Sequence, residues 1–311
     1  MNDLEAVKNI AENLNFSFDQ GKARLQIERN LHRIVLEIID ENGQILLLKY
    51  LLQVNEPFLT KFQQETDVLT ELSRAKVHFH FNEIFKSGTE PKPWFVCSCL
   101  QGVTLGNSFQ FDSKYLSENF SDFLVGALRE ISQTTPVESD SSKFDRIKKV
   151  FGKASLSQSM KKYEDNLNQY LLDSKELLAD QANYVFAHND LTPLNILKTP
   201  SGYGIIDWES SQTDLLTHDA AYLFHRAWGN SVWQENFQSK LFRKLFEEKD
   251  QSLFLLEILE LLVYDISVFE KMLDQNNFAV YHNDDLSEAK IRELHQLFLS
   301  KLDQFLAGGL K

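Results

Sequence analysis

The hydrophobic pattern changes its period about a third of the way along the chain, and this change limits the possible folds. In residues 31–39 apolar residues alternate with others, which is the period of a half-buried strand. Asp40 to Gly43 supplies turn chemistry, and residues 44–51 form a second apolar run. The two runs and the turn between them predict a β-hairpin.

Two more strands are expected, at 77–85 and 94–100, with a loop at 87–91 between them. Beyond Gly102 the apolar residues follow mostly helical spacing. The expected elements of that part are helices at 117–134, 155–182, 253–263 and 291–305, and a compact β segment at 184–208. The pattern therefore predicts a small β-rich lobe followed by a large helical lobe.

The charge of the chain narrows the class of partner. Its 311 residues include 32 Lys and Arg against 45 Asp and Glu, so the net charge is −13. An acidic surface repels nucleic-acid phosphates and anionic lipid head groups. We therefore expect neither a nucleic acid nor a membrane as a partner.

The compartment is predicted from three sequence features. Polar and charged residues within 1–16 leave no apolar core for a signal peptide, and no apolar run approaches the ~18 residues of a membrane helix. Cys97 and Cys99 lie two apart in an apolar stretch, and we interpret both as reduced packing residues rather than as a metal or redox pair. The prediction is a cytoplasmic protein.

Two charged residues stand in patterns that otherwise require apolar ones. Lys49 has apolar neighbours on either face of the second hairpin strand. After Pro57, apolar residues at steps of three and four predict a helix, and Glu65 interrupts its apolar stripe. Because a lone buried ion is far more costly than a paired one, we expect Lys49 and Glu65 to form an ion pair. The alternative is that Lys49 reaches solvent from an edge strand and Glu65 lies on the rim of the stripe.

The strongest functional motif lies at 186–209. His188, Asp190, Asn195 and Asp207 are polar residues within apolar surroundings. They converge if residues 195–197 and 204–206 form a hairpin. Phosphoryl transfer needs such a set. One carboxylate orients the attacking hydroxyl, while an Asn and a second carboxylate hold Mg²⁺ against the nucleotide phosphates.

This segment resembles the catalytic core of the aminoglycoside phosphotransferase and choline kinase superfamily. The shared pattern is His-x-Asp-x-x-x-x-Asn followed by Ile-Asp-Trp, and the local sequence is most similar to the choline kinase branch. The resemblance implies that Asp190 is the catalytic base, that His188 supports the catalytic loop, and that Asn195 and Asp207 bind Mg²⁺. It also implies that Asp219 braces the loop.

The resemblance extends toward the start of the chain. Lys49 falls where the family places its phosphate-binding lysine, and Glu65 where it places the ion-pair partner of that lysine. Ser98, Cys99 and Leu100 are similar to the hinge that contacts adenine through backbone groups, so ATP is the implied nucleotide.

The fold implied by the resemblance is α+β and protein-kinase-like, with two lobes. The expected boundaries are 1–101 for the nucleotide-binding lobe and 102–311 for the catalytic and substrate-binding lobe. One departure is that no glycine-rich loop precedes the Lys49 strand, because residues 28–33 occupy that place.

A second departure concerns the substrate. Asn189, Thr192 and Leu194 stand where many relatives of the aminoglycoside branch have Gly, His and Gly. The acceptor within the superfamily is therefore not identified by the motif.

Other interpretations of these residues stay open. A metal-dependent hydrolase would also use His and Asp, but it would not explain Asn195, Lys49 and Glu65. His78 and His80 share one face of an expected strand, which fits a metal site or, more simply, a partly exposed strand. A pseudokinase that binds nucleotide or acts as a scaffold is the alternative function, although the complete set of motif residues argues against it.

The expected function is an ATP- and Mg²⁺-dependent kinase that phosphorylates a hydroxyl group of a small-molecule acceptor. Carboxylates assigned to the large lobe favour a cationic amine, choline-like or aminoglycoside-like: Glu209, Asp214, Asp265, Asp284 and Asp285. Four aromatic residues fit either a cage for such an amine or the core: Trp228, Trp233, Tyr264 and Tyr281.

Overall fold

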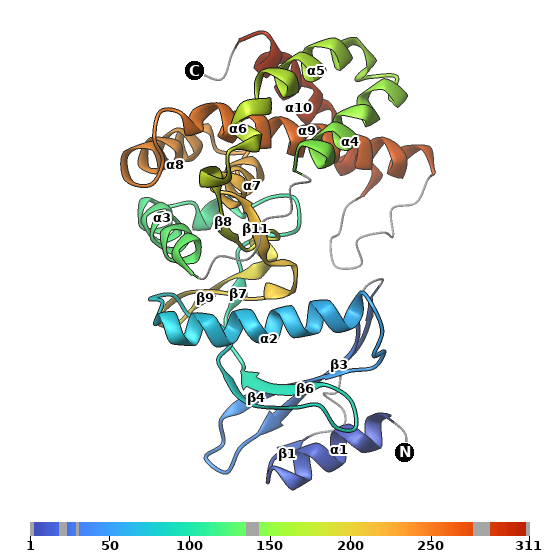
Figure 1. Ribbon diagram of the computed structural model, residues 1–311, viewed down its shortest axis with the longest axis vertical. Helices are drawn as coiled ribbons and strands as arrows, with labels where there is room; N and C mark the ends of the chain where they lie inside the picture. The colour runs from blue at the N-terminus through green and yellow to red at the C-terminus, as the bar shows by residue number, and fades with distance from the viewer. Residues whose placement is uncertain (1–2, 19–23, 29–30, 135–142, 276–286, 309–311) are drawn as a thin grey trace. The chain divides into compact units, whose positions relative to one another are not determined.

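The computed structural model describes residues 3–18, 24–28, 31–134, 143–275 and 287–308 (Figure 1). The chain forms two compact units. Unit 1 consists of Met1–Thr104 with Asn195–Ser211, and unit 2 of Leu105–Leu194 with Gln212–Lys311. Unit 1 therefore combines the β-rich first third with a segment from the motif region.

Unit 1 is built on an antiparallel six-stranded sheet with the order β1-β3-β4-β6-β5, in which β2 also pairs with β3. The strands are β1 (Ser17–Phe18), β2 (Arg24–Glu28), β3 (Leu31–Ile39), β4 (Ile45–Leu51), β5 (Ile84–Gly88) and β6 (Trp94–Ser98). The predicted hairpin is confirmed as β3 and β4. Gly43 adopts a φ of +80° in its turn, and its N–H donates to Asp40 O at 3.1 Å.

The alternation along β3 and β4 gives the sheet two different faces. One face packs on α1 (Asp3–Asn13) and forms the core of this unit. Its buried residues on the two strands are Ile34, Leu36, Ile38, Leu46, Leu48 and Tyr50. The alternate residues form a second, more polar face: Arg33, Val35 and Glu37 on β3, and Leu47 and Lys49 on β4.

Helix α2 (Phe58–Ala75) confirms the helix predicted after Pro57. Its buried residues are Phe62, Glu65, Val68, Leu69 and Leu72, so the apolar stripe faces inward with the carboxylate in it. The helix ends where Lys76 takes a left-handed φ of 55° and its N–H bonds Leu72 O.

The strand expected at 77–85 is wrong. Strand β5 begins only at Ile84, and the preceding segment makes a single bridge between His80 and Gly204. Phe79 and Phe81 are both buried, which produces a strand-like alternation without a strand. The loop between β5 and β6 consequently begins after Gly88 rather than at residue 87.

The second sheet of unit 1 explains why the motif segment belongs to it. Strands β9 (Ile196–Thr199) and β10 (Gly202–Ile205) pair as the hairpin that the sequence predicts. Strand β7 (Val103–Thr104) pairs with β9 on its other side, so the order is β10-β9-β7. These pairings join a segment from the middle of the chain to the first third.

Unit 2 is mostly helical. Its helices are α3 (Glu118–Gln133), α4 (Lys143–Leu156), α5 (Glu164–Asp173), α6 (Lys175–Ala179), α7 (His218–Arg226), α8 (Ser231–Lys244), α9 (Asp250–Asp274) and α10 (Glu288–Leu306). Strands β8 (Tyr184–Ala187) and β11 (Gln212–Leu215) pair with each other. Helix α9 packs against α4, α7 and α10, and these four helices lie together in Figure 1.

The single helix expected at 155–182 is wrong, whereas the helices predicted around 117–134, 253–263 and 291–305 are confirmed as α3, α9 and α10. Helix α4 begins earlier and ends at Leu156. Ser157 follows, and its hydroxyl accepts the N–H of Met160 at 3.0 Å, which offers the backbone an alternative to the helical bond.

None of the helices in the described part of the chain combines the length and the apolar character needed to cross a membrane.

Candidate functional site

In unit 1 the predicted ion pair between β4 and α2 is confirmed. Lys49 Nζ lies 2.5 Å from Glu65 Oε1, and the two residues are 7% and 1% exposed. Each charge thus has an opposite partner out of contact with water, which is the arrangement that makes two buried ions tolerable. Lys49 does not reach solvent, and Glu65 is not on the rim of the helix.

The sequence analysis did not identify a second cation in the same place, Arg33 on β3. Its guanidinium lies 3.2 Å from Glu65 Oε2, 2.9 Å from Glu209 Oε2 and 3.6 Å from Asp207 Oδ1. We call Arg33, Lys49, Glu65, Asp207 and Glu209 the Arg33 cluster. The signal was present in the sequence, because Arg33 lies on the face of β3 opposite to the apolar alternation.

Burial and neighbouring charges act against each other in the Arg33 cluster. Burial lowers the pKa of Arg33, but the carboxylates of Glu65, Asp207 and Glu209 outweigh it, and the pKa is raised. The pKa of Glu209 is raised to about 7, chiefly by burial. The negative charge of Asp207 also raises this pKa, whereas the positive charge of Arg33 lowers it. The cluster therefore holds its acids close together with too little positive charge to neutralise all of them.

A cavity of about 290 Å³ opens onto this cluster within unit 1. Arg33, Lys49 and Asp207 are charged residues of its lining, and Val35, Leu47 and Ile206 are among its apolar ones. The polar face of β3 and β4 thus meets the end of the β9–β10 hairpin. A cavity with convergent charges and apolar walls suits a ligand that has both a charged part and an apolar part.

The three expected hinge residues differ in their backbone bonds. Ser98 N–H donates to Glu83 O at 2.8 Å, and Ser98 O accepts from Asn82 Nδ2 at 2.7 Å, so its backbone is engaged inside unit 1. Cys99 and Leu100 line the cavity.

Both cysteines are free thiols, as expected. Cys97 is buried, and burial raises the pKa of its thiol to about 12, so it stays protonated.

The two expected metal ligands are both in unit 1. Asn195 is buried, and its carbonyl accepts the N–H of Ile206 at 2.9 Å, next to Asp207. Asp207 has a left-handed backbone with φ 69°, which is costly for a residue other than glycine. Trp208 fixes this turn, since its indole donates to Ile205 O at 3.2 Å and its ring stacks on Phe79.

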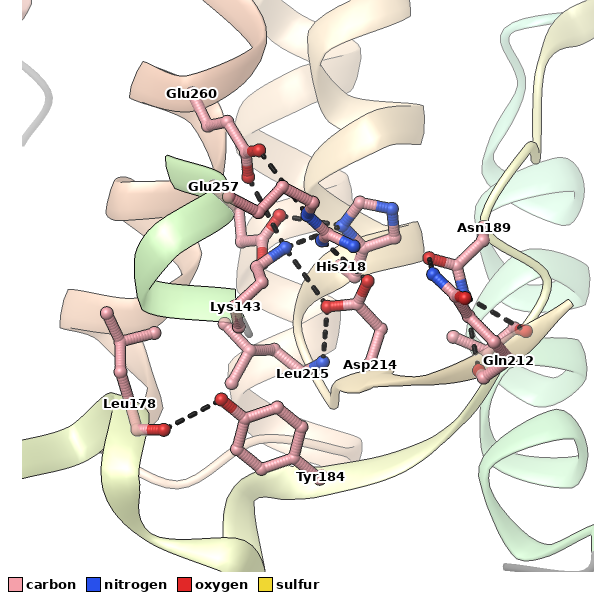
Figure 2. A network of polar contacts seen from close by, with 12 residues as sticks. Lys143, Leu178, Tyr184, Asn189, Gln212, Asp214, Leu215, His218, Glu257 and Glu260 are labelled. Carbon is pink, nitrogen blue, oxygen red and sulfur yellow. Dashed lines mark hydrogen bonds and ion pairs between the residues drawn. The ribbon is translucent and has the colours of Figure 1, made fainter. Parts of the chain in front are cut away.

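In unit 2 Asp219 holds the loop that carries Asp190. One oxygen of Asp219 accepts the N–H of His188 at 2.6 Å, and the other accepts the N–H of Asn189 at 2.9 Å. Asn189 has a φ of +63°, and its side chain bonds the backbone carbonyl of Gln212 (Figure 2). The expected bracing by Asp219 is confirmed.

His188 acts on the loop from inside. It is fully buried, and its Nδ1 accepts the N–H of Asp190 at 3.3 Å. The ring therefore contacts the backbone of Asp190 and not solvent, in agreement with a supporting position.

A second group of charges in unit 2 was not predicted. We call it the Lys143 cluster, and Figure 2 shows Lys143 at its centre. Lys143 Nζ lies 2.6 Å from Glu257, 3.0 Å from Asp214 and 3.3 Å from Glu260. The cluster also contains Arg146, 2.6 Å from Asp214, and His218, whose Nδ1 is 2.7 Å from Glu257. The sequence signal was the pair of acids, Glu257 and Glu260, in the otherwise apolar run 253–263 of α9.

The Lys143 cluster does not fit a metal ion. Ligand atoms of Asp214, His218 and Glu257 lie within 4.8 Å of one another, which is a spacing that a metal could bridge. Lys143 already contacts both carboxylates, however, and its ammonium supplies the positive charge that a metal would bring. The group is therefore a buried ion-pair network.

The carboxylates that favoured a cationic acceptor are largely compensated. Asp214 belongs to the Lys143 cluster, and Asp265 pairs with Arg226 and His225. Glu209 belongs to unit 1, and Asp284 and Asp285 lie outside the described residues. The charge argument for an amine acceptor is thus weaker in the structure than in the sequence.

The aromatic cage is not supported by the described residues. Trp228 and Trp233 are buried, and Trp233 stacks on Phe237 with ring centroids 4.8 Å apart. Tyr264 is partly exposed under Lys153, and Tyr281 lies outside the described residues. The two tryptophans are core residues.

His78 and His80 form no metal group with a third ligand in the described chain, and His80 Nε2 lies 2.9 Å from Ser201 Oγ.

The site residues are therefore shared between the units. Lys49, Glu65, Asn195 and Asp207 belong to unit 1, while His188, Asp190 and Asp219 belong to unit 2. The convergence of the two sets stays a prediction.

A family model with the description "Phosphotransferase enzyme family" matches residues 28–252. The chain belongs to this family. The match spans the Arg33 cluster, the catalytic loop and Asp219, and the protein-kinase-like α+β fold expected from the resemblance is confirmed. None of the curated protein sequences compared with the chain matches it.

Solved structures of low sequence identity share the fold. A GDP complex of an aminoglycoside 2′-phosphotransferase is 14% identical with a TM-score of 0.64, covering 99% of this chain and 100% of that one. A choline/ethanolamine kinase family protein from Mesorhizobium loti is 14% identical with a TM-score of 0.62, at 99% and 98% coverage. The choline kinase LicA from Streptococcus pneumoniae is 16% identical with a TM-score of 0.58, and the match covers 98% of this chain and 98% of that one. Both branches of the superfamily are thus among the structural relatives.

Proposed function

We propose that this phosphotransferase is an ATP- and Mg²⁺-dependent kinase that phosphorylates a hydroxyl group of a small molecule. The observation that carries the proposal is the cavity of unit 1, which places the buried Lys49–Glu65 pair and Asp207 beside apolar walls. The adenine ring needs apolar contact, whereas the phosphates need cations, and the cavity offers both.

In this proposal the cavity binds the nucleotide. Lys49 contacts the phosphates, and Glu65 keeps its ammonium in place. Cys99 and Leu100 offer backbone groups to adenine, and Ser98 anchors this hinge through its own backbone bonds.

Asn195 and Asp207 would hold Mg²⁺. The donor set suits the ion, because Mg²⁺ prefers amide and carboxylate oxygens. Asp207 Oδ1 is buried and accepts no hydrogen bond among the described residues, and its contact with Arg33 Nη2 is an ion pair at 3.6 Å, so the oxygen lies where a positive charge is favourable. When bound, the ion supplies the charge that neutralises the transferring phosphates.

Asp190 would accept the proton of the acceptor hydroxyl as that hydroxyl attacks the phosphate. The carboxylate is set for this role by the backbone around it, since Asp219 holds the two preceding N–H groups and His188 holds its own. A preset base loses less entropy at the moment of reaction.

The acceptor is a small molecule, and a choline-like or aminoglycoside-like amine is the first class to test. The absence of nucleic-acid and membrane partners remains part of the proposal on the grounds of charge. A cytoplasmic location remains part of it on the grounds of the two free cysteines. The pseudokinase is not favoured, because the family motif is complete and its loop is braced.

A coupled ADP-release screen tests the proposal. Amines, aminoglycosides, macrolides and sugars are offered with ATP or GTP and Mg²⁺, and we expect turnover with at least one acceptor. No turnover across the panel, together with no thermal shift on adding either nucleotide with Mg²⁺, would contradict it.

Two substitutions separate catalysis from binding. We expect Asp190→Ala to lower kcat by roughly 10²–10⁴-fold with an unchanged nucleotide Kd, because only the base is removed. We expect Asp207→Ala to remove the dependence of nucleotide affinity on Mg²⁺. An Asp190→Ala variant with undiminished turnover would contradict the assignment of Asp190 as the base.

A further inference from the structure

Arg33 is a cation of the cavity lining that neither the motif nor the family resemblance explains. It is 5% exposed, it lines the cavity together with Lys49, and it lies on β3, the strand that precedes the Lys49 strand. A buried guanidinium is retained only where its donors are used, since an arginine is almost always charged. Its present partners are three carboxylates from two parts of unit 1.

Two of these partners are part of the proposed nucleotide site. Glu65 is shared with Lys49, so one carboxylate lies between two cations, with its Oε2 toward Arg33 and its Oε1 toward Lys49. Asp207 is the proposed metal ligand, and its Oδ1 lies 3.6 Å from Arg33 Nη2. Arg33 therefore links the ion pair of the cavity to the proposed metal ligand.

The chain lacks the element that usually contacts nucleotide phosphates at this position. Residues 28–33 contain no glycine, whereas a phosphate loop relies on glycines to bring backbone N–H groups close to the ligand. Without such a loop the donors must come from side chains. Arginine is suited to this, because its planar fork presents several N–H groups that match phosphate oxygens in pairs.

The charge of the Arg33 cluster points the same way. The two cations Arg33 and Lys49 face the three acids Glu65, Asp207 and Glu209, so the cavity without ligand holds no surplus positive charge. A metal ion that binds Asp207 would take over the neutralisation of that carboxylate. Arg33 Nη2, which now forms an ion pair with Asp207 at 3.6 Å, would then become available to an anion.

We propose that Arg33 is a nucleotide phosphate-binding residue of this cavity, which replaces the missing glycine loop and which holds Asp207 in place while the cavity is empty. The proposal rests on the proposed function, because it assumes that the cavity takes a nucleotide. It assigns one further residue, Arg33, to the nucleotide site, and it predicts that the partner of this residue changes when the nucleotide binds. Arg33 turns from a carboxylate to a phosphate when the nucleotide and its metal bind.

Calorimetric titration with three probes tests this role without any acceptor. ATP, ADP and adenosine, each with Mg²⁺, are titrated into the full-length wild type, Arg33→Met, Arg33→Lys and a control, Arg74→Met. Arg74 lies on α2 in the same unit, and its side chain is 70% exposed. Circular dichroism and thermal melts confirm that each variant is folded.

A phosphate contact affects the three probes unequally. We expect Arg33→Met to lower the affinity for ATP and ADP by roughly ten- to a hundredfold, because a charge-assisted hydrogen bond is lost. The affinity for adenosine should fall by less than about threefold. The affinity of Arg33→Lys for ATP and ADP should lie between those of the wild type and Arg33→Met, because a lysine keeps the charge and loses the planar set of N–H donors. Arg74→Met should match the wild type.

The outcomes separate this inference from the proposed function. A wild type that binds none of the three probes overturns both. A wild type that binds ATP, with an Arg33→Met variant of equal affinity, overturns only the role of Arg33. An equal loss for ATP and adenosine also overturns it, because Arg33 would then only maintain the shape of the cavity. If Arg33→Met does not fold, the same comparison between ATP and adenosine is made with Arg33→Lys.

Discussion

At the scale of single residues, the carboxylate of Asp219 sets the geometry of the catalytic loop. Its two oxygens are each used by one backbone N–H, those of His188 and Asn189. The second of these residues has a left-handed backbone that an isolated chain would rarely adopt. A carboxylate is the side chain that can accept at both positions, since an amide of the same shape offers one acceptor and one donor.

Asp219→Asn therefore places an NH₂ group against a backbone N–H. We expect a loss of roughly 1–3 kcal/mol in the free energy of unfolding, because a buried donor is left without an acceptor. We also expect kcat with the acceptor found in the screen to fall at least tenfold, while the KM for nucleotide changes little. Denaturant titration and steady-state kinetics measure the two effects.

The control for this substitution is Asp145→Asn on the exposed side of α4, which makes the same chemical change away from the loop. It should leave both quantities unchanged. An Asp219→Asn enzyme with the kcat of the wild type would show that the loop does not depend on this carboxylate.

At the scale of elements, α7 carries a histidine near each end, and the pKa values of the two are shifted in opposite directions. His218 at the start of α7 faces Asp214, Glu257 and Lys143 from β11, α9 and α4. Burial lowers the pKa of His218, but the two carboxylates outweigh it, and the pKa is raised above 6.5. At the other end, burial lowers the pKa of His225 to about 4 in spite of Asp265.

The two shifts have opposite consequences for stability. The stability that charged His218 contributes is complete below pH 6.5 and is lost as the pH rises through its folded pKa. His225 is neutral in the fold, so its contribution is present above pH 6.5 and is lost as the pH falls toward 4, by roughly 3 kcal/mol. We expect the free energy of unfolding to be highest near pH 6.5.

Urea denaturation from pH 4.5 to 9 measures this profile. We expect His218→Asn to flatten the limb above pH 6.5 and His225→Asn to flatten the limb from 6.5 downward, whatever each substitution costs in absolute stability. A wild-type stability that still rises steadily between pH 7 and 8.5 would contradict the charged state of His218. The exposed His78 gives a control, because His78→Asn should leave both limbs unchanged.

Elements were predictable from sequence where their pattern is local. The β3–β4 hairpin and helices α2, α9 and α10 carry their own period, and Lys49 and Glu65 were identified because each breaks such a period. The segment at 77–85 was mistaken for a strand because the burial of Phe79 and Phe81 gives it a strand-like alternation. Arg33 and Lys143 were missed because their ion-pair partners are distant in the sequence, so the local signal at each cluster does not identify the partner.

At the scale of the whole chain, unit 1 is discontinuous, and this has a consequence for how it folds. Residues 195–211 complete the sheet with β7 and bury Trp208 against Phe79, whose rings lie 6.0 Å apart. A fragment of residues 1–104 would lack both contacts. We expect it to be largely unfolded, with no cooperative thermal transition.

The register of the second sheet indicates how the unit can be made continuous. Strand β7 ends at Thr104 opposite Leu197 of the antiparallel β9, so the end of one strand and the start of the other lie at the same edge. A short glycine-rich turn from residue 104 to residue 195 would therefore close a hairpin without a long crossing connection. We expect this joined chain, 1–104 followed by 195–211, to melt cooperatively.

Circular dichroism melts of the fragment, the joined chain and the joined chain with Trp208→Ala decide the matter. Trp208 is fully buried, and truncation of such a side chain costs about 3–5 kcal/mol, so the third chain should lose most of the stability of the second. A joined chain that fails to melt cooperatively would mean that residues 105–194 are also needed to fold unit 1. A cooperative joined chain should bind ATP with Mg²⁺, because every residue that lines the cavity comes from the segments it retains.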